Sequence, residues 1–181
     1  MTGLHHMLVH FPLAFWALAT LLTLVASLSS GYWAELSRKA LLPLLILSLL
    51  GAAAAIVSGL LVWPIEANTH SPMTRNHILI SYWSVAIYTL LTILIWRGGS
   101  SAFSGCKRWV LVILALIGSV LFAISGTLGG HLAGAPTLVS TLLGLLGWNV
   151  YSTLYVPDWT LIAVILIGIG CLLVGWKTKQ Q

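Results

Sequence analysis

The sequence predicts an all-α integral membrane protein: an up-down transmembrane bundle with a four-helix core and a fifth, C-terminal span. Of its 181 residues, 59% are apolar and only 6% are charged, whereas about a quarter of the residues in a soluble domain are charged. Five apolar runs approach the roughly 20 residues that a helix needs to cross a bilayer. None of these runs alternates between polar and apolar residues, which favours helices over the strands of a barrel.

The first span is expected at residues 4–28 and carries three histidines near its beginning. His6 and His10 are four residues apart, so on a helix they share one face, while His5 is expected to point elsewhere. Pro12 has no backbone N–H, and it is expected either to kink this helix or to delay its start. The span therefore presents a pair of imidazoles near one membrane surface.

The second and fourth spans, expected at residues 40–64 and 109–131, each contain a row of small residues four positions apart. Such rows ordinarily let membrane helices pack closely. They would also leave room for a flat macrocycle, and the two interpretations are compatible. The rows are Gly51, Ala55 and Gly59 in the second span, and Gly126, Gly130 and Gly134 at the end of the fourth.

The third span is expected at residues 73–96. Ser71 and Pro72 resemble an N-cap followed by a first-turn proline, which places His77 about one and a half turns inside the helix. A polar stripe facing lipid would be unfavourable, so this face is expected to look into the bundle. The stripe runs from His77 through Ser81, Ser84 and Tyr88.

The C-terminal part differs from this pattern. Residues 137–149 are apolar but short and follow Pro136, so we expect a half-span or a helix lying in the interface. Residues 159–176 form the expected fifth span, before a short basic tail. The chain is thus expected to divide into a four-helix core at 1–135 and a C-terminal part at 136–181.

Five crossings place the basic residues almost entirely on one side of the membrane. The positive-inside rule makes this side cytoplasmic, with the N-terminus outside and the C-terminus inside. The residues on this side are Arg38, Lys39, Arg97, Lys107, Arg108, Lys177 and Lys179, against Arg75 on the other. All the histidines fall on the outer side, namely His5, His6, His10, His70, His77 and His131.

Several function classes are not expected. The Lys and Arg residues lie in short clusters between apolar runs and form no basic face for nucleic acid. Cys106 and Cys171 lie in no C-x-x-C-H motif for covalent haem. The chain has no nucleophile motif, paired carboxylates or phosphate-binding loop. A non-catalytic electron-transfer or anchor subunit is therefore more consistent with the sequence than a self-contained enzyme.

The histidines suggest a cofactor. Ionisable side chains at membrane depth are costly and usually functional, and imidazole is a common axial ligand of b-type haem. His10 and His77 are the leading ligand pair for one or two haems b, because their helices are plausible diagonal neighbours in an up-down bundle. Arg75 lies two residues before His77, where it either pairs with a haem propionate or is simply solvated.

In the haem hypothesis, His131 would be a replacement ligand, or part of a second site with His5, His6 or His70.

Two other hypotheses remain open. The second hypothesis is a copper or zinc protein, because imidazole suits these metals equally well. Its ligands would be His5, His6, His10 and His131. The third hypothesis is an anchor for a periplasmic enzyme, in which the histidines are only hydrogen-bonded.

Several motifs resemble those of the bacterial membrane family catalogued as domain of unknown function 2231. Residues 5–12, HHMLVHFP, resemble that family's His-Pro-x-Leu-Val-His-Phe-Pro opening, although His6 replaces the proline. Residues 59–63, GLLVW, resemble its Gly-Leu-Leu-Asp-Trp motif, with Val62 in place of the aspartate. Residues 125–130, SGTLGG, resemble its Ser-Gly-x-Leu-Gly-Gly motif.

The resemblance covers about residues 4–134 and the family's four-helix design, and the fifth span has no counterpart in it. Arg75 and His77 resemble its Arg-x-x-x-His element with a shorter spacing, and His131 stands where the family often has an acid. Family members occur joined to, or beside, periplasmic redox domains. The resemblance thus implies an electron-transfer role in a bacterial membrane, with His10 and His77 as recurrent histidines. The leading hypothesis is a b-type cytochrome subunit of the bacterial inner membrane, surrounded by lipid, that passes electrons between a periplasmic redox protein and the quinone pool or other membrane subunits.

Overall fold

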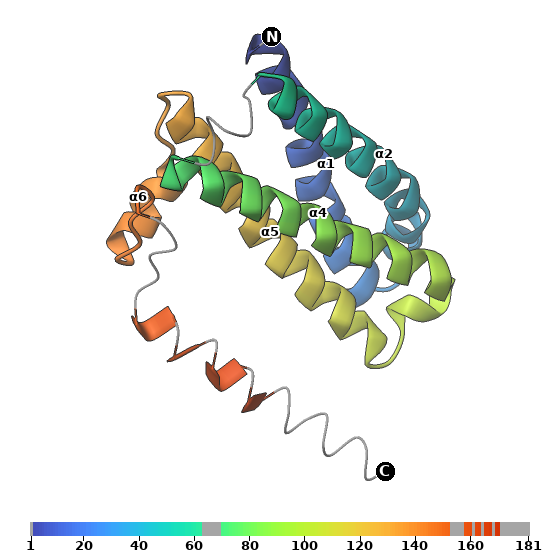
Figure 1. Cartoon of the computed structure of the whole chain (residues 1–181). Helices are drawn as coiled ribbons and strands as arrows, with labels where there is room; N and C mark the ends of the chain where they lie inside the picture. The colour runs from blue at the N-terminus through green and yellow to red at the C-terminus, as the bar shows by residue number, and fades with distance from the viewer. Residues whose placement is uncertain are drawn as a thin grey trace.

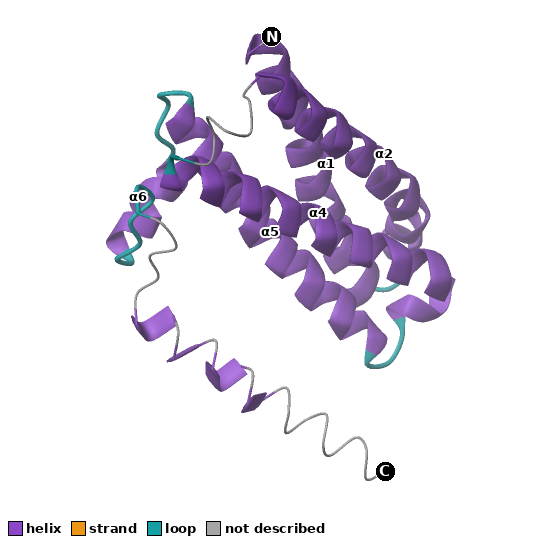
Figure 2. Cartoon of the chain, viewed as in Figure 1, coloured by secondary structure: helices purple, strands orange, loops and turns teal. Residues whose placement is uncertain are grey.

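The computed structural model describes residues 2–62 and 70–152, together with parts of the segment 158–170. Within these residues the chain is helical and contains no strand (Figure 2). Four helices are long and apolar enough to cross a membrane. They are α1 (Thr2–Leu28), α2 (Tyr32–Val62), α4 (Pro72–Gly98) and α5 (Lys107–Leu132). The predicted four-helix, up-down core is therefore confirmed.

The four helices form two antiparallel hairpins, one of α1 and α2 and one of α4 and α5 (Figure 1). A short turn joins α1 to α2, and its Gly31 has a φ of +84°, a conformation that costs glycine little. The connection between α4 and α5 contains a short 3-10 helix, η1 (Gly99–Phe103). The hairpins contact each other chiefly through α1 and α5. They diverge toward the end that carries the N-terminus.

The predicted spans agree with the helices except at two points. Helix α2 begins at Tyr32 rather than at residue 40, because hydropathy marks the apolar part of a helix whereas its polar first turns continue the same hydrogen-bonding pattern. Pro12 lies inside α1, which already begins at Thr2. The prediction that Pro12 delays the helix is therefore wrong. Pro12 is the eleventh residue of α1, so it removes one hydrogen bond from the helix interior, which membrane helices tolerate where neighbouring groups bond the freed carbonyl.

Helix α6 (Leu138–Leu145) is too short to cross a membrane. Its eight residues span about 12 Å at 1.5 Å per residue, against roughly 30 Å of hydrocarbon. Thr137 caps it by accepting a hydrogen bond from the backbone N–H of Ser140. The expectation that residues 137–149 do not cross is consistent with this length. The expected fifth span at 159–176 lies largely outside the described residues.

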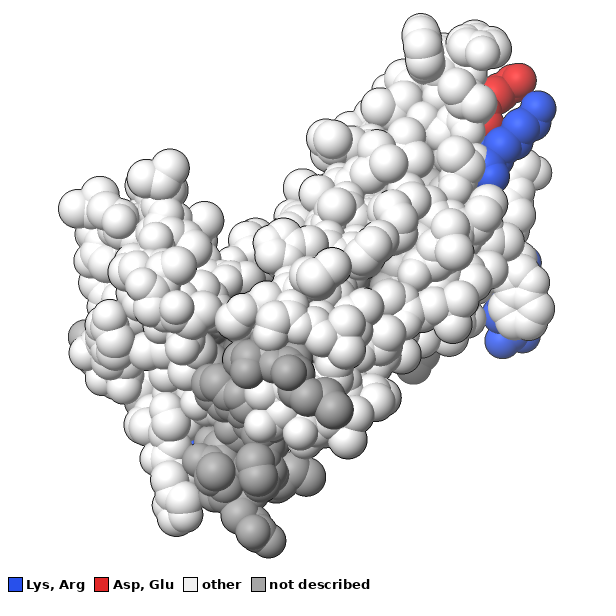
Figure 3. Space-filling model, turned by 90° about the horizontal axis from the view of Figure 1, so that it is seen from above, with Lys and Arg blue, Asp and Glu red and all other residues white. Residues whose placement is uncertain are grey.

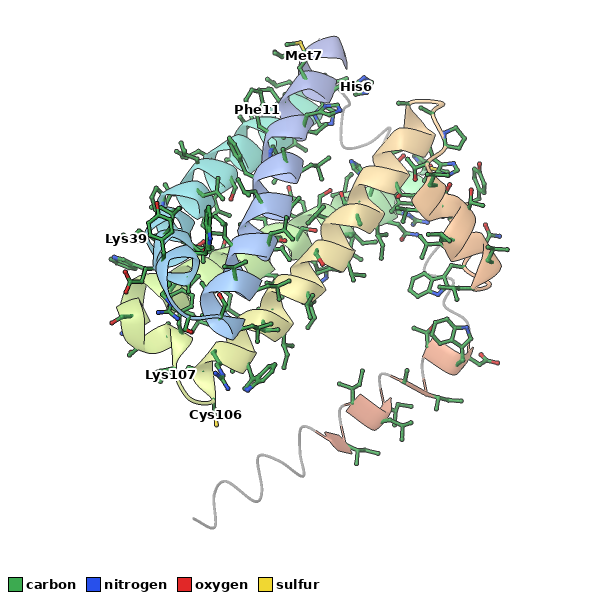
Figure 4. The ribbon with its side chains drawn as sticks, turned by 180° about the vertical axis from the view of Figure 1, so that it is seen from behind. His6, Met7, Phe11, Lys39, Cys106 and Lys107 are labelled. Carbon is green, nitrogen blue, oxygen red and sulfur yellow. The ribbon has the colours of Figure 1, made fainter. Side chains whose placement is uncertain are left out.

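The bundle carries its apolar side chains outward as well as inward. Leu21, Leu50 and Leu61 are each at least 60% exposed, as expected of a surface that contacts lipid. Figure 3 shows a face that is almost entirely uncharged, with charged side chains gathered at one edge. In Figure 4, Lys39 and Lys107 lie at one end of the bundle and His6 at the other. We call these the basic end and the histidine end.

Candidate functional site

A cavity of about 770 Å³ lies at the histidine end, where the two hairpins diverge. This volume is within the range of roughly 300–1,000 Å³ that is usual for small-molecule and cofactor sites. All four long helices contribute to its lining, which includes Leu13, Ile56, Ile78, Val85 and Phe122. The cavity therefore combines an apolar wall with the histidines that begin α1 and α4.

His77 enters the cavity from α4. Ser71 caps this helix by accepting a hydrogen bond from the N–H of Thr74, and Pro72 follows in the first turn, as predicted. The Nδ1–H of His77 donates to the backbone carbonyl of Ser125 at 2.9 Å. The ring packs against Gly129 of α5, where an added Cβ would lie 3.2 Å from His77 Cε1. Helix α5 thus holds this imidazole in place.

The polar stripe below His77 faces inward, as predicted. Ser81 lines the cavity, and its hydroxyl is hydrogen-bonded to that of Ser125 at 2.7 Å. Ser84 and Tyr88 are completely buried. These contacts keep the polar face of α4 away from lipid and fix the direction in which His77 projects.

His5 enters the same cavity from α1. Its Nδ1 lies 3.0 Å from the carbonyl of Ala55 and 3.1 Å from the hydroxyl of Ser58. The ring packs against Gly59 of α2. The prediction that His5 points elsewhere is therefore wrong. Because the two hairpins diverge at this end, more than one row of side chains on α1 is left uncovered. His5 therefore lines the cavity together with His6 and His10.

His6 and His10 also line the cavity, and both are exposed. The Nδ1–H of His10 donates to the backbone carbonyl of His6 within the same helix, at 2.5 Å. His10 is consequently oriented by its own helix. His5 and His77 are instead each oriented by the other helix of their hairpin.

The hydrogen bonds set the tautomer of these rings. A carbonyl only accepts, so in His5, His10 and His77 the proton lies on Nδ1. Each Nε2 then carries a free lone pair, and no described residue bonds to it. Histidines that ligate metals typically donate their other ring N–H to a carbonyl or carboxylate. Three imidazoles thus share this orientation, in which Nδ1 is hydrogen-bonded to a backbone carbonyl and Nε2 is not bonded to any described residue.

Other predicted site residues lie elsewhere. His131 lines a separate hollow of about 470 Å³ with Trp148 and Tyr151, and its Nδ1 is hydrogen-bonded to Tyr151 Oη at 3.1 Å. His70 and Arg75 are exposed, and neither lines the cavity. Of the histidines named above for a copper or zinc centre, His5, His6 and His10 therefore line one cavity, whereas His131 lies apart from them. Within the described residues, no three His, Cys, Asp or Glu side chains are grouped so that they could hold one metal ion.

Residues 2–141 match the family described as predicted membrane protein (DUF2231). The chain belongs to this family. The matched DUF2231 region includes every residue that lines the cavity, and it ends within α6. It also agrees with the resemblance expected over about residues 4–134. No curated protein and no solved structure matches the chain.

Two positions of this DUF2231 site were missed by sequence reasoning. The row of small residues predicted for the fourth span is Gly126, Gly130 and Gly134, but the glycine that packs against the His77 ring is Gly129. Gly134 lies beyond the end of α5. Ser125 was noted only as part of a motif, although its carbonyl orients His77. The available signal was a serine and a glycine four residues apart, which share one helix face.

Proposed function

We propose that this chain binds haem b and transfers electrons at the outer side of the bacterial inner membrane. The observation that supports it best is the set of imidazoles that face one apolar cavity from both hairpins. His5 and His10 come from α1 and His77 from α4, and the Nε2 of each is not bonded to any described residue. Two neutral imidazoles from separate helices are a usual axial ligand set for a b-type haem.

The cavity suits the group in three respects. Its volume of about 770 Å³ is that of a cofactor site. Its wall of aliphatic and aromatic side chains would exclude water, and the hydrogen bonds from Ser125 and Ala55 would hold the imidazoles in one orientation. Such second-sphere bonds also tune a metal's potential. A bound haem would supply one-electron transfer at its iron.

In this proposal, the placement of charge determines on which side of the membrane the cavity lies. The basic end would lie in the cytoplasm, so the histidine end and its cavity would open toward the periplasm. An extracytoplasmic redox protein would exchange electrons there, and the quinone pool or a larger membrane complex would be the other partner. Lipid surrounds the bundle. The chain itself would act as an electron-transfer subunit rather than as an enzyme.

The absorption spectrum of the purified protein tests this proposal. We expect a Soret band and visible bands that sharpen on reduction, either as isolated or after addition of hemin. His77→Ala should lose the sharp visible bands of low-spin haem, while the matched variant His70→Ala, at an exposed histidine outside the cavity, should keep them. A colourless protein that binds stoichiometric copper or zinc would overturn haem in favour of those metals. One that binds neither would support the role of a membrane anchor.

A further inference from the structure

The two hairpins line the cavity with residues at equivalent positions, a twofold relation that is not evident from the sequence. Each residue of α2 that lines it has a counterpart 70 positions later in α5, and these counterparts are all the α5 residues that line it. Ala52 and Phe122, Ala55 and Ser125, and Gly59 and Gly129 are three such pairs. In α1 and α4 the shift is 72 positions, as for His5 and His77 or Leu13 and Val85. The two hairpins therefore build the cavity as two equivalent halves.

The surroundings of His5 and His77 repeat in the same way. Each ring packs on a glycine of the neighbouring helix, Gly59 for His5 and Gly129 for His77. Each Nδ1–H is directed at the carbonyl of the residue four positions before that glycine. Because the same kinds of contact hold His5 and His77 in the two halves, we expect the two histidines to have the same role.

The other cavity histidines do not follow this relationship. The counterpart of His6 is Ile78, and that of His10 is Tyr82. Below the cavity, Trp16 and Tyr88 are again 72 positions apart, and they stack with their planes within 3° of each other. The twofold relation therefore extends into the core. It selects His5 and His77 as the equivalent pair of imidazoles.

We infer that His5 and His77, one from each hairpin, are the two axial ligands of the cofactor, and that His10 is not a ligand. This inference rests on the proposed function above, and it replaces the predicted pair of His10 and His77. The cofactor would then be a planar group bound between two equivalent half-sites. Such a cofactor is a metal macrocycle that accepts one imidazole on each face.

The glycines offer a test that leaves the imidazoles in place. A Cβ at Gly59 would lie 2.9 Å from His5 Cε1, and one at Gly129 would lie 3.2 Å from His77 Cε1. Alanine at either position must move the ring, and because the ring is the end of a side chain the fold can adjust. Gly51 of α2 is the matched control, because it does not line the cavity. An added Cβ there would meet only ordinary contacts, at 3.5 Å or more.

The experiment is to reconstitute the purified full-length protein with hemin and to record absorption and electron paramagnetic resonance spectra. His5→Ala and His77→Ala should each convert low-spin haem to high-spin haem, and added imidazole should restore the low-spin form in both. His10→Ala should stay low-spin. Gly59→Ala and Gly129→Ala should raise the high-spin fraction, whereas Gly51→Ala should not.

The outcomes separate this inference from the proposed function. If the wild type binds haem and His10→Ala loses the low-spin form while His5→Ala keeps it, the ligand pair is wrong and haem binding stands. If the wild type takes up no haem, both are wrong. If His5→Ala fails to fold, the glycine variants decide, because an unchanged spectrum in both Gly59→Ala and Gly129→Ala contradicts the assignment.

Discussion

Trp16 and Tyr88 stack face to face between the two hairpins, with their ring centroids 4.8 Å apart. Trp16 is 5% exposed and Tyr88 is completely buried. Tyr88 Oη is also hydrogen-bonded to Thr20 Oγ1 at 2.8 Å. The stack joins α1 to α4 directly below the cavity, since Trp16 also lines the cavity. It therefore sets how far apart the hairpins lie at the depth of the site.

Removing the indole should loosen this junction. We expect Trp16→Ala to lower the free energy of unfolding by about 3 kcal/mol, as is typical when a large buried aromatic side chain is truncated. Trp83→Ala is the matched control, because Trp83 is 55% exposed on the lipid-facing surface. Thermal unfolding in detergent measures both. Equal losses in the two variants would contradict the structural role given to the stack.

The Tyr88 hydroxyl should contribute a smaller amount. Tyr88→Phe keeps the stacked ring but leaves Thr20 without this partner, and one buried hydrogen bond is worth about 1 kcal/mol. Tyr32→Phe serves as the control, because Tyr32 is 71% exposed. The same unfolding measurement applies. A Tyr88→Phe protein as stable as the wild type would show that the hydroxyl makes no net contribution to the free energy of unfolding.

Gly118 should not accept a side chain. An added Cβ would lie 2.8 Å from Tyr88 Cε2 and 3.2 Å from Ile87 Cγ2, and the stack with Trp16 prevents the Tyr88 ring from moving away. We expect Gly118→Ala to destabilise the protein by roughly 1–3 kcal/mol, the usual cost of overpacking. Gly144→Ala, with no atom within 4 Å of its Cβ, should be close to neutral. Unfolding of the two variants side by side would show whether this difference exists.

Arg38 should be sensitive even to replacement by lysine. Its Nε and Nη2 both donate to the carbonyl of Ala26, at 3.0 and 2.8 Å, and its guanidinium lies 5.5 Å from the centre of the Phe103 ring. Lysine keeps the charge but has no planar fork, so we expect Arg38→Lys to cost about 1 kcal/mol. Arg97→Lys, at an exposed arginine, is the control. If both variants unfold alike, the fork adds nothing to stability.

The orientation in the membrane can be read from Cys106, which is an exposed free thiol at the basic end (Figure 4). In a Cys171→Ala background, a membrane-impermeant maleimide should label Cys106 in inverted vesicles and not in intact cells. A protein without native cysteines that carries His70→Cys, at an exposed position of the histidine end, should show the opposite pattern. Labelling of Cys106 in intact cells would invert the proposed topology.

Much of the fold could be predicted because it depends on properties that are local along the chain. Ser71 and Pro72 mark the start of α4, and the stripe from His77 to Tyr88 marks its inward face; both predictions are confirmed. The gathering of the histidines at one end also follows from counting spans. These results need only hydropathy, helix geometry and capping chemistry.

The composition of the site was less accessible from the sequence. His5 and His10 are both plausible ligands in a helical projection, and only the contacts with Ala55 and Gly59 distinguish them. His131 is near the other histidines when spans are counted, but the structure places it in a separate hollow. Its direction depends on the turn after α5 and on Tyr151, neither of which a periodic pattern describes.

Hydropathy and short motifs are enough to recognise a membrane protein of the DUF2231 family with four long helices and histidines at one end. The packing of those helices is needed to establish which imidazoles share a cavity. It also revealed the twofold relation, because few residues are identical at the equivalent positions of the two hairpins. The physical reason is that hydrophobicity specifies burial along one helix, whereas the direction of each ring depends on the backbone carbonyls and glycines of the helix beside it.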